Sequence, residues 1–179
     1  MDLEIGGQLA ARALSARLGA SLAQLGARIA SCESCTSGAV ADAISWAPGA
    51  SAWFEVGLVC YSEKAKTQLA GVPVELFATD GVVSVEVAKA MAQGAAGRAG
   101  CRFGVATTGL AGPGGAVGPR GFLAQGTVCI CAWDAEMELA IAETFVFAGG
   151  RADVRASATL AAMEMAVGLV ESAVGDPSA

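Results

Sequence analysis

Short apolar segments of strand length alternate with longer segments of helical periodicity along this chain, and this order restricts the fold more than any other feature. Strands are expected at 28–32, 56–62 and 103–107, each bounded by polar or turn-forming residues. Helices are expected before, between and after these strands, at 5–25, 34–46, 65–69, 84–97 and 152–174. Strands that are separated by helices predict a sheet whose first strands are parallel.

The later part of the chain adds a different pattern. Two apolar strands, 127–133 and 138–147, meet at a short polar turn and predict a hairpin. The segment 109–125 is rich in glycine, contains two prolines and is expected to be an irregular loop. Together the elements predict an α/β fold with a mostly parallel sheet, one antiparallel strand and helices on both faces. We expect a single domain over 1–179, with frayed ends at 1–4 and 175–179.

Charge and hydropathy exclude several classes of partner. The net charge of -6 argues against non-specific nucleic-acid binding, although arginines could still hold a small anionic ligand. Every apolar stretch is interrupted before the ~20 residues that a membrane span requires, so no membrane contact is expected. The acidic N-terminus is a poor export signal, which predicts a cytoplasmic protein with six reduced cysteines.

The chain contains no histidine, one tyrosine and three lysines. Ser-His-Asp and Cys-His catalysis are therefore impossible, and so are zinc sites that need imidazole. A nucleophilic enzyme built from this sequence must use lysine, tyrosine, a carboxylate or water as its base.

Two segments that directly follow expected strands carry the side chains best suited to catalysis. Ser34 lies at a strand-to-helix junction, where N–H groups could hold an oxyanion, although serine is also an ordinary cap there. The only tyrosine, Tyr61, is followed closely by Lys64 and Lys66. Such a lysine is either a solvated charge or, where burial lowers its pKa, a general base.

Two glycine-rich segments are candidates for binding an anion. In 107–115, glycines would let backbone N–H groups approach a phosphate, and a flexible surface loop is the alternative, because the segment lacks the Walker ending. In 149–155, arginines lie at a helix start, which suits a phosphate, and a surface salt bridge with Asp153 or Glu143 is the alternative.

The cysteines suggest a third kind of chemistry. Cys32 and Cys35 have the spacing of a redox or metal motif, and Cys129 and Cys131 could add two thiolates. Strand alternation places Cys129 and Cys131 on one face, where small apolar residues are expected. We expect no metal, and a thiol redox or zinc protein remains an alternative.

Several motifs occur in a characteristic order between about residues 9 and 170. They are Cys-Glu-Ser-Cys-Thr-Ser-Gly at 32–38, Pro-Gly-Ala-Ser at 48–51, Tyr-Ser-Glu-Lys-Ala-Lys at 61–66, Gly-Val-Val-Ser at 81–84, Thr-Thr-Gly-Leu-Ala-Gly-Pro-Gly-Gly at 107–115, Gln-Gly-Thr-Val at 125–128 and Phe-Ala-Gly-Gly-Arg at 147–151. In this set and order the chain resembles the CinA carboxy-terminal domain family, the nicotinamide-nucleotide amidases.

The resemblance implies a serine amidohydrolase that converts nicotinamide mononucleotide to nicotinate mononucleotide and ammonia. It implies that Ser34 is the nucleophile and Lys66 the base. Tyr61 and Thr108 match residues that orient the pair or relay the proton. The implied substrate-binding residues are Cys35, Thr36, Gly109, Gly112 and Arg151, the first two as oxyanion donors and the last near the phosphate or the catalytic groups.

The resemblance also implies an architecture and a set of partners. The expected fold is a three-layer α/β/α sandwich with a mixed, mostly parallel five-stranded sheet. The nucleotide substrate is the expected small-molecule partner, without a metal or organic cofactor, and a homodimer or higher homo-oligomer is expected. The role implied is in NAD metabolism, as in pyridine-nucleotide salvage.

The chain departs from the family pattern at three places. Ser37 replaces a glycine beside the nucleophile, Cys60 replaces a threonine, and 117–125 is longer and lacks a Lys-Pro pair. A non-catalytic CinA-like domain that binds nucleotide or regulates is therefore the main alternative. The enzyme is favoured because the motif residues are all present: Ser34, Tyr61, Lys66 and Thr108.

Overall fold

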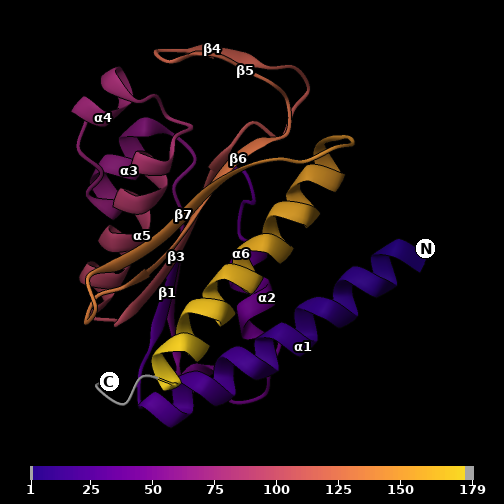
Figure 1. The fold of residues 1–179 in the computed structure, drawn as a ribbon, viewed down its shortest axis with the longest axis vertical. Coiled ribbons are helices and arrows are strands. Elements are labelled where there is room, and N and C mark those ends of the chain that lie inside the picture. The colour runs from indigo at the N-terminus through magenta and orange to yellow at the C-terminus, as the bar shows by residue number, and fades with distance from the viewer. Residues whose placement is uncertain (1, 176–179) are drawn as a thin grey trace.

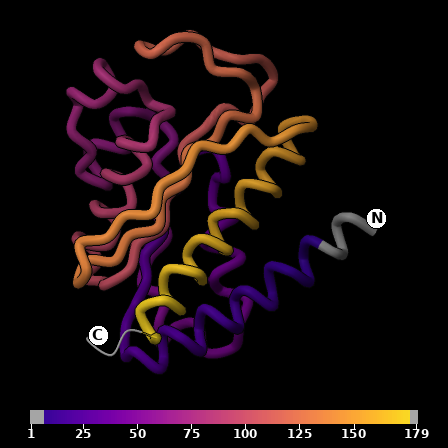
Figure 2. Tube along the Cα trace, in the orientation of Figure 1, coloured from indigo at the N-terminus to yellow at the C-terminus, as the bar shows by residue number. Residues whose placement is uncertain are grey.

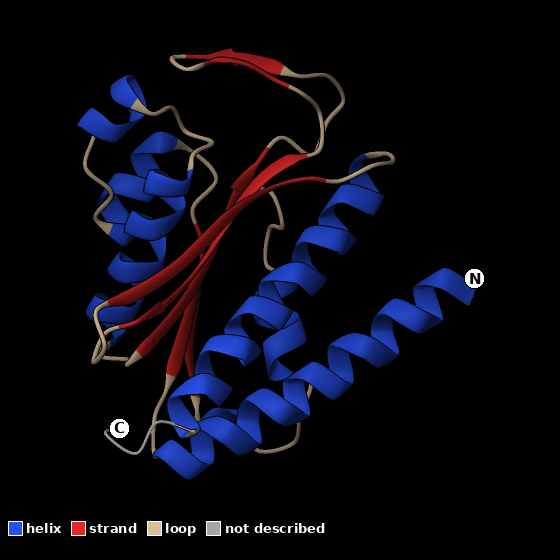
Figure 3. Cartoon of the chain, in the orientation of Figure 1, coloured by secondary structure: helices blue, strands red, loops and turns tan. Residues whose placement is uncertain are grey.

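The computed structural model describes residues 2–175, with side chains from residue 7 onward. Residues 1 and 176–179, which belong to the ends expected to fray, lie outside the described residues. A five-stranded sheet runs through the centre of the described chain (Figure 3). Its strands are β1 (Ile29–Glu33), β2 (Phe54–Val59), β3 (Phe103–Gly109), β6 (Thr127–Asp134) and β7 (Leu139–Val146).

The strand order β2-β1-β3-β6-β7 confirms the predicted mixed sheet. Strand β1 lies between β2 and β3 and pairs in parallel with both. Strand β6 is antiparallel to β3 and to β7, so it is the one strand that runs against the other four. The carboxyl ends of β1, β2 and β3 therefore meet at one edge of the sheet, which is where open α/β folds bind ligands.

Helices cover both faces, which confirms the three-layer sandwich (Figure 1). One layer holds α1 (Asp2–Leu25), α2 (Ala39–Ser45) and α6 (Arg151–Val174), and the other holds α3 (Glu63–Ala70), α4 (Glu75–Thr79) and α5 (Val85–Ala99). Helix α1 crosses α6 at an angle, and Arg17 pairs with Glu171 where the two meet (Figure 2).

Strand alternation divides the core into two clusters. Ile29, Phe103 and Ile130 face α1 and α6, whereas Cys32 and Ala106 face α5. Cys129 and Cys131 both lie in the second cluster, on the one face that the alternation predicted for them.

Helix α6 is long and apolar enough to cross a membrane by length and composition alone. Half of its most apolar window is buried inside the protein, where Val154, Ala158 and Met163 pack in the core. Packing against the sheet therefore accounts for its apolar character.

The prediction that 109–125 is an irregular loop is wrong in part. The segment is not irregular throughout, because β4 (Ala116–Gly118) and β5 (Gly121–Leu123) form a two-stranded hairpin. Gly118 pairs with Gly121 across the turn, and Gly121 takes a φ of 113°, a value that favours glycine. The glycines that suggested an irregular loop thus permit a tight turn. The short helix α4 and the 3-10 turn η1 (Ala50–Ala52) were also not predicted.

Candidate functional site

Ser34 directly follows β1, the strand flanked on both sides by parallel neighbours. Its backbone N–H donates to the Thr107 carbonyl at 2.9 Å, so β3 holds the turn from one side. From the other side, the Cys60 N–H donates to the Glu33 carbonyl at 2.7 Å. The Ser34 side chain is 7% exposed, so its hydroxyl lies just beneath the surface.

Lys66 reaches Ser34 from the neighbouring helix. Ser62 caps α3 by accepting the Ala65 N–H, and Lys66 follows one turn later with its side chain fully buried. Its Nζ lies 2.9 Å from Ser34 Oγ and 2.9 Å from the Cys60 carbonyl. Burial lowers the pKa of Lys66, because the charged amine loses its hydration. No ion pair among the described side chains gives it a carboxylate partner.

Glu33 fixes the turn that carries Ser34, a role that the sequence analysis missed. Its buried carboxylate accepts the Thr36 hydroxyl at 2.7 Å and three backbone N–H groups of the α2 start, those of Gly38, Val40 and Ala41, at 2.8 to 3.0 Å. A carboxylate at a helix N-terminus satisfies otherwise unpaired donors and complements the helix dipole. The sequence feature that could have indicated this role is a glutamate directly before a Ser-x-Thr sequence at a helix start.

Tyr61 and Arg151 meet above the buried pair. Arg151 donates to the Tyr61 hydroxyl at 2.9 Å and to the Gly112 carbonyl at 2.9 Å, so one guanidinium joins three distant segments. The Tyr61 hydroxyl binds Arg151, and only the backbone carbonyl of Tyr61 contacts Lys66, at 3.4 Å. One turn along α6, Arg155 donates to the Thr36 carbonyl at 3.0 Å.

Thr108 lies at the same sheet edge, and its side-chain hydrogen bond goes to a residue outside the Ser-Lys pair. Its hydroxyl donates to the Val82 carbonyl at 2.8 Å. The preceding residue, Thr107, is the one in contact with the Ser34 turn, through a 2.7 Å bond to the Thr36 hydroxyl. The structure therefore brings Ser34 and Lys66 into direct contact. Of the two threonines, it is Thr107 that contacts the Ser34 turn, whereas Thr108 bonds to Val82.

Gly109 and Gly112 allow close packing at the base of the following loop. A Cβ at Gly109 would lie 2.7 Å from the Thr127 carbonyl oxygen. Gly112 has a φ of 101° and presses against the Gln125 side chain. Both positions therefore require glycine for backbone geometry.

Comparisons with known proteins place this chain in a family. The profile of the CinA C-terminal domain matches residues 11–170. The chain belongs to the CinA C-terminal domain family. It is 42% identical over 151 residues to the nicotinamide-nucleotide amidohydrolase PncC of Pseudomonas putida, covering 84% of this chain and 91% of that protein. It is 41% identical over 140 residues to a CinA-like protein of Mycobacterium sp. strain JLS, covering 78% of this chain but only 32% of that longer protein.

Solved structures of CinA proteins share the fold. A competence or damage-inducible protein from Enterobacter asburiae superposes with a TM-score of 0.82 at 28% identity, covering 89% of this chain and 98% of that one. A competence/damage-inducible protein from Agrobacterium tumefaciens gives 0.81 at 30% identity, covering 93% and 96%.

This CinA family member has a serine at position 37, where the family pattern has a glycine. The backbone conformation at this position would suit glycine better than serine. Ser37 has a φ of 57°, in the left-handed region that disfavours side chains with a Cβ. The next residue, Gly38, also has positive φ and precedes α2. The turn after the nucleophile thus keeps its shape despite the serine.

The cysteines of this CinA domain are buried and free. Burial raises the pKa of Cys35, which follows Ser34, to about 11, so its thiol stays protonated at neutral pH. Among the described residues, no group of three or more Cys, Asp or Glu side chains is arranged to hold a metal ion.

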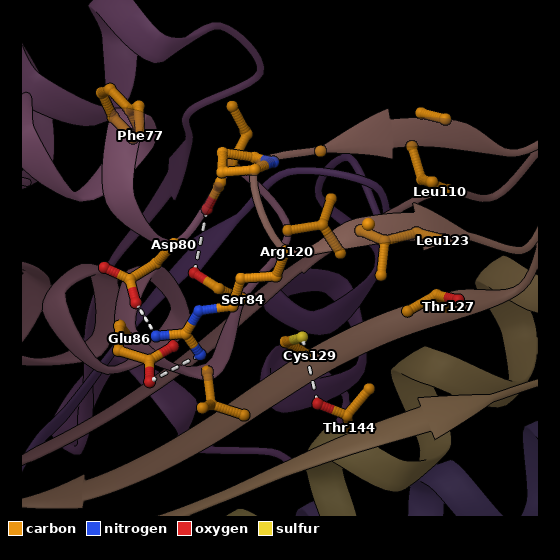
Figure 4. A pocket seen from close by; sticks show the side chains of 18 of the residues that line it. Phe77, Asp80, Ser84, Glu86, Leu110, Arg120, Leu123, Thr127, Cys129 and Thr144 are labelled. Atoms are coloured by element: carbon orange, nitrogen blue, oxygen red, sulfur yellow. Dashed lines mark hydrogen bonds and ion pairs between the residues drawn. The ribbon is translucent and has the colours of Figure 1, made fainter.

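A cavity of about 430 Å³ opens beside the site (Figure 4). It lies between α4, the start of α5 and the β4–β5 hairpin, and Ser34, Lys66, Tyr61 and Arg151 do not line it. Arg120 at the hairpin turn pairs with Asp80 and, at 3.4 Å, with Glu86, and so fastens the hairpin over the cavity.

Proposed function

We propose that this CinA domain hydrolyses the carboxamide of nicotinamide mononucleotide to give nicotinate mononucleotide and ammonia. The single observation that supports the chemistry most strongly is the 2.9 Å contact between Lys66 Nζ and Ser34 Oγ in a buried setting. The likeness to PncC, which spans most of both chains, supports the substrate.

Lys66 acts as the general base. Its lowered pKa increases the share of neutral amine, which can accept the Ser34 proton as the oxygen attacks the carboxamide carbon. The amine then returns that proton to the leaving nitrogen, and ammonia departs from a Ser34 acyl-enzyme. Water, activated by the same amine, hydrolyses the ester and restores the serine.

Backbone donors stabilise the oxyanion. Within the turn, the Ser34 N–H is taken by Thr107 and the Gly38 N–H by Glu33. We assign the N–H groups between them, those of Cys35 and Thr36, to the developing negative oxygen. The Glu33 carboxylate keeps this turn in place from the opposite face of the sheet.

Arg151 and Arg155 suit the substrate phosphate. They lie one turn apart at the start of α6, and neither takes part in an ion pair within the described part of the chain. Guanidinium groups at a helix N-terminus favour phosphate. Tyr61 and Gly112 then orient Arg151, while Thr108 and Gly109 shape the adjoining edge.

The setting and partners follow from the same proposal. The ligand is a small nucleotide, and we place the protein in the cytoplasm, where that nucleotide is made and consumed. We expect neither nucleic acid nor membrane as a partner, and we expect a homodimer or higher homo-oligomer.

The test is ammonia release from nicotinamide mononucleotide by the unmodified chain, by Ser34→Ala and by Lys66→Met. We expect ammonia from the unmodified chain and a loss of about 10²–10⁴-fold in each variant. If the unmodified chain binds the nucleotide but releases no ammonia, the domain is a non-catalytic nucleotide-binding member and the amidase proposal fails.

A further inference from the structure

The cavity beneath the hairpin has the walls of a site for a flat apolar group. Phe77, Val82 and Leu110 line it, together with Val117 and Leu123 of the hairpin. Figure 4 shows Phe77, Leu110 and Leu123 of this lining together with Arg120. An aromatic ring would bury apolar surface against such walls.

The charged side chains of the cavity are mostly acidic. Glu63, Asp80 and Glu86 line it against a single cation, Arg120. Arg120 pairs with both Asp80 and Glu86, so a single cation balances three carboxylates of the lining. A cavity with apolar walls and surplus carboxylates attracts an organic cation and repels a phosphate.

One carboxylate oxygen lacks a partner. Glu86 Oε1 receives Arg120 at 3.4 Å, whereas Glu86 Oε2 is buried without a hydrogen bond. A buried oxygen without a donor is costly, and a cationic ligand at this position would remove the cost.

The cavity adjoins the catalytic pair through two connections. Glu63 lies three residues before Lys66 on α3, a spacing that brings side chains onto neighbouring positions of one helix face. Val82, in the cavity wall, accepts the Thr108 hydroxyl, and the neighbouring Thr107 carbonyl holds the Ser34 N–H. The cavity wall is therefore joined through β3 to the turn that carries Ser34.

We propose that this cavity is the subsite for the cationic pyridinium ring of the substrate, and that Glu63 and Glu86 select a charged ring over a neutral one. The assignment rests on the proposed amidase function. It divides the substrate between regions of opposite charge, with the ring on the acidic cavity and the phosphate on Arg151 and Arg155.

The experiment compares two ligands that differ only in ring charge. The first is nicotinamide mononucleotide, and the second is the nucleotide in which a neutral benzamide ring replaces the pyridinium ring. Their dissociation constants are measured by calorimetry on Ser34→Ala protein, which prevents turnover. We expect the charged ring to bind about tenfold tighter.

Further substitutions in the Ser34→Ala protein test which residues cause the preference for the charged ring. Glu86→Gln and, separately, Glu63→Gln should weaken the charged ligand about threefold or more and leave the neutral ligand unchanged. Glu75→Gln is the matched control, because Glu75 is an exposed carboxylate of α4 that does not line the cavity. Thermal melting of each variant verifies that it is folded.

Equal affinity for the two rings would overturn the proposal, as would an equal weakening of both ligands in the two cavity variants. Failure of nicotinamide mononucleotide itself to bind would overturn it too. Ammonia release by the unmodified chain is measured separately, so loss of the ring preference with turnover intact removes only the ring assignment. A preserved preference without turnover removes only the amidase function.

Discussion

Lys66 is the residue at which folding and chemistry conflict most directly. A buried amine is unfavourable when charged, and its hydrogen-bond acceptors here are neutral oxygens, those of Ser34, Cys60 and Tyr61. The same burial lowers the pKa of the amine and so increases the share of the neutral form that a general base requires. Position 66 was predictable from its motif, whereas its burial was not.

The pH dependence of turnover should follow this amine. Because the base must be neutral and its pKa is lowered, kcat/KM should rise with pH through a pKa below the ordinary lysine value of about 10.4. Initial rates of ammonia release from pH 6 to 10 provide the measurement. A rate that rises about tenfold per pH unit up to pH 10 without levelling off would show that Lys66 has an ordinary pKa.

Ser37 offers a second test at single-residue scale. Replacing it by glycine removes the Cβ that disfavours its φ of 57°, so Ser37→Gly should stabilise the protein by about 0.5–1 kcal/mol. Ser37→Ala keeps a Cβ and is the control, for which no gain is expected. Urea unfolding of the three proteins measures the difference, and an equal gain in both variants would contradict the backbone explanation.

At the scale of elements, helix α5 is pressed closely against its neighbours. A Cβ at Gly94 would lie 1.6 Å from the Ala70 carbonyl oxygen of α3, and one at Gly104 of β3 would lie 2.3 Å from the Ala92 carbonyl oxygen of α5. Only glycine allows these backbones to approach so closely. The position of α3, and with it that of Lys66, therefore depends on the α5 packing.

Two glycines of α5 should respond in opposite directions to alanine. Gly94→Ala forces α3 away and should destabilise the protein by about 1–3 kcal/mol, with a lower rate of ammonia release. Gly97→Ala, at an exposed position with nothing within 4 Å, should stabilise by about 0.5–1 kcal/mol. Thermal melting separates the two, and similar shifts in both would contradict the close packing.

The β4–β5 hairpin is held at its turn mainly by charge. Arg120→Ala removes its pairs with Asp80 and Glu86, so hydrogen exchange across 114–124 should rise several-fold. High salt should produce part of the same rise in the unmodified protein, because exposed ion pairs are screened. Unchanged exchange in the variant would mean that backbone pairing alone holds the hairpin.

At the scale of the whole molecule, a sheet with both faces covered keeps the Lys66 amine buried, and that burial disfavours its charged form. The site occupies one edge of that sheet and draws on both helical layers: α3 supplies Lys66 and α6 supplies Arg151. The free energy of unfolding of the whole protein should therefore depend on the protonation state of Lys66.

Comparison with Lys66→Met isolates the contribution of the Lys66 amine to the pH dependence of stability. The lowered pKa means that the unfolded chain binds a proton which the folded chain lacks, so stability rises with pH between the folded and unfolded pKa values. Relative to Lys66→Met, the unmodified chain should gain up to about 1.4 kcal/mol per pH unit within that window. Urea unfolding from pH 6 to 10 gives both curves, and parallel curves would contradict a shifted lysine.

The amino-acid sequence by itself determined the order of strands and helices, the cap at Ser84, and the candidates Ser34 and Lys66, because these depend on periodicity and on short motifs. It did not reveal the β4–β5 hairpin, since composition alone does not show which glycines serve a turn. Only the tertiary structure decided that Arg151 meets Tyr61, 90 residues away, that Glu33 anchors the nucleophile turn, and that acidic side chains gather in a cavity. Contacts of this kind depend on how layers pack, and local sequence patterns do not encode the distances between layers.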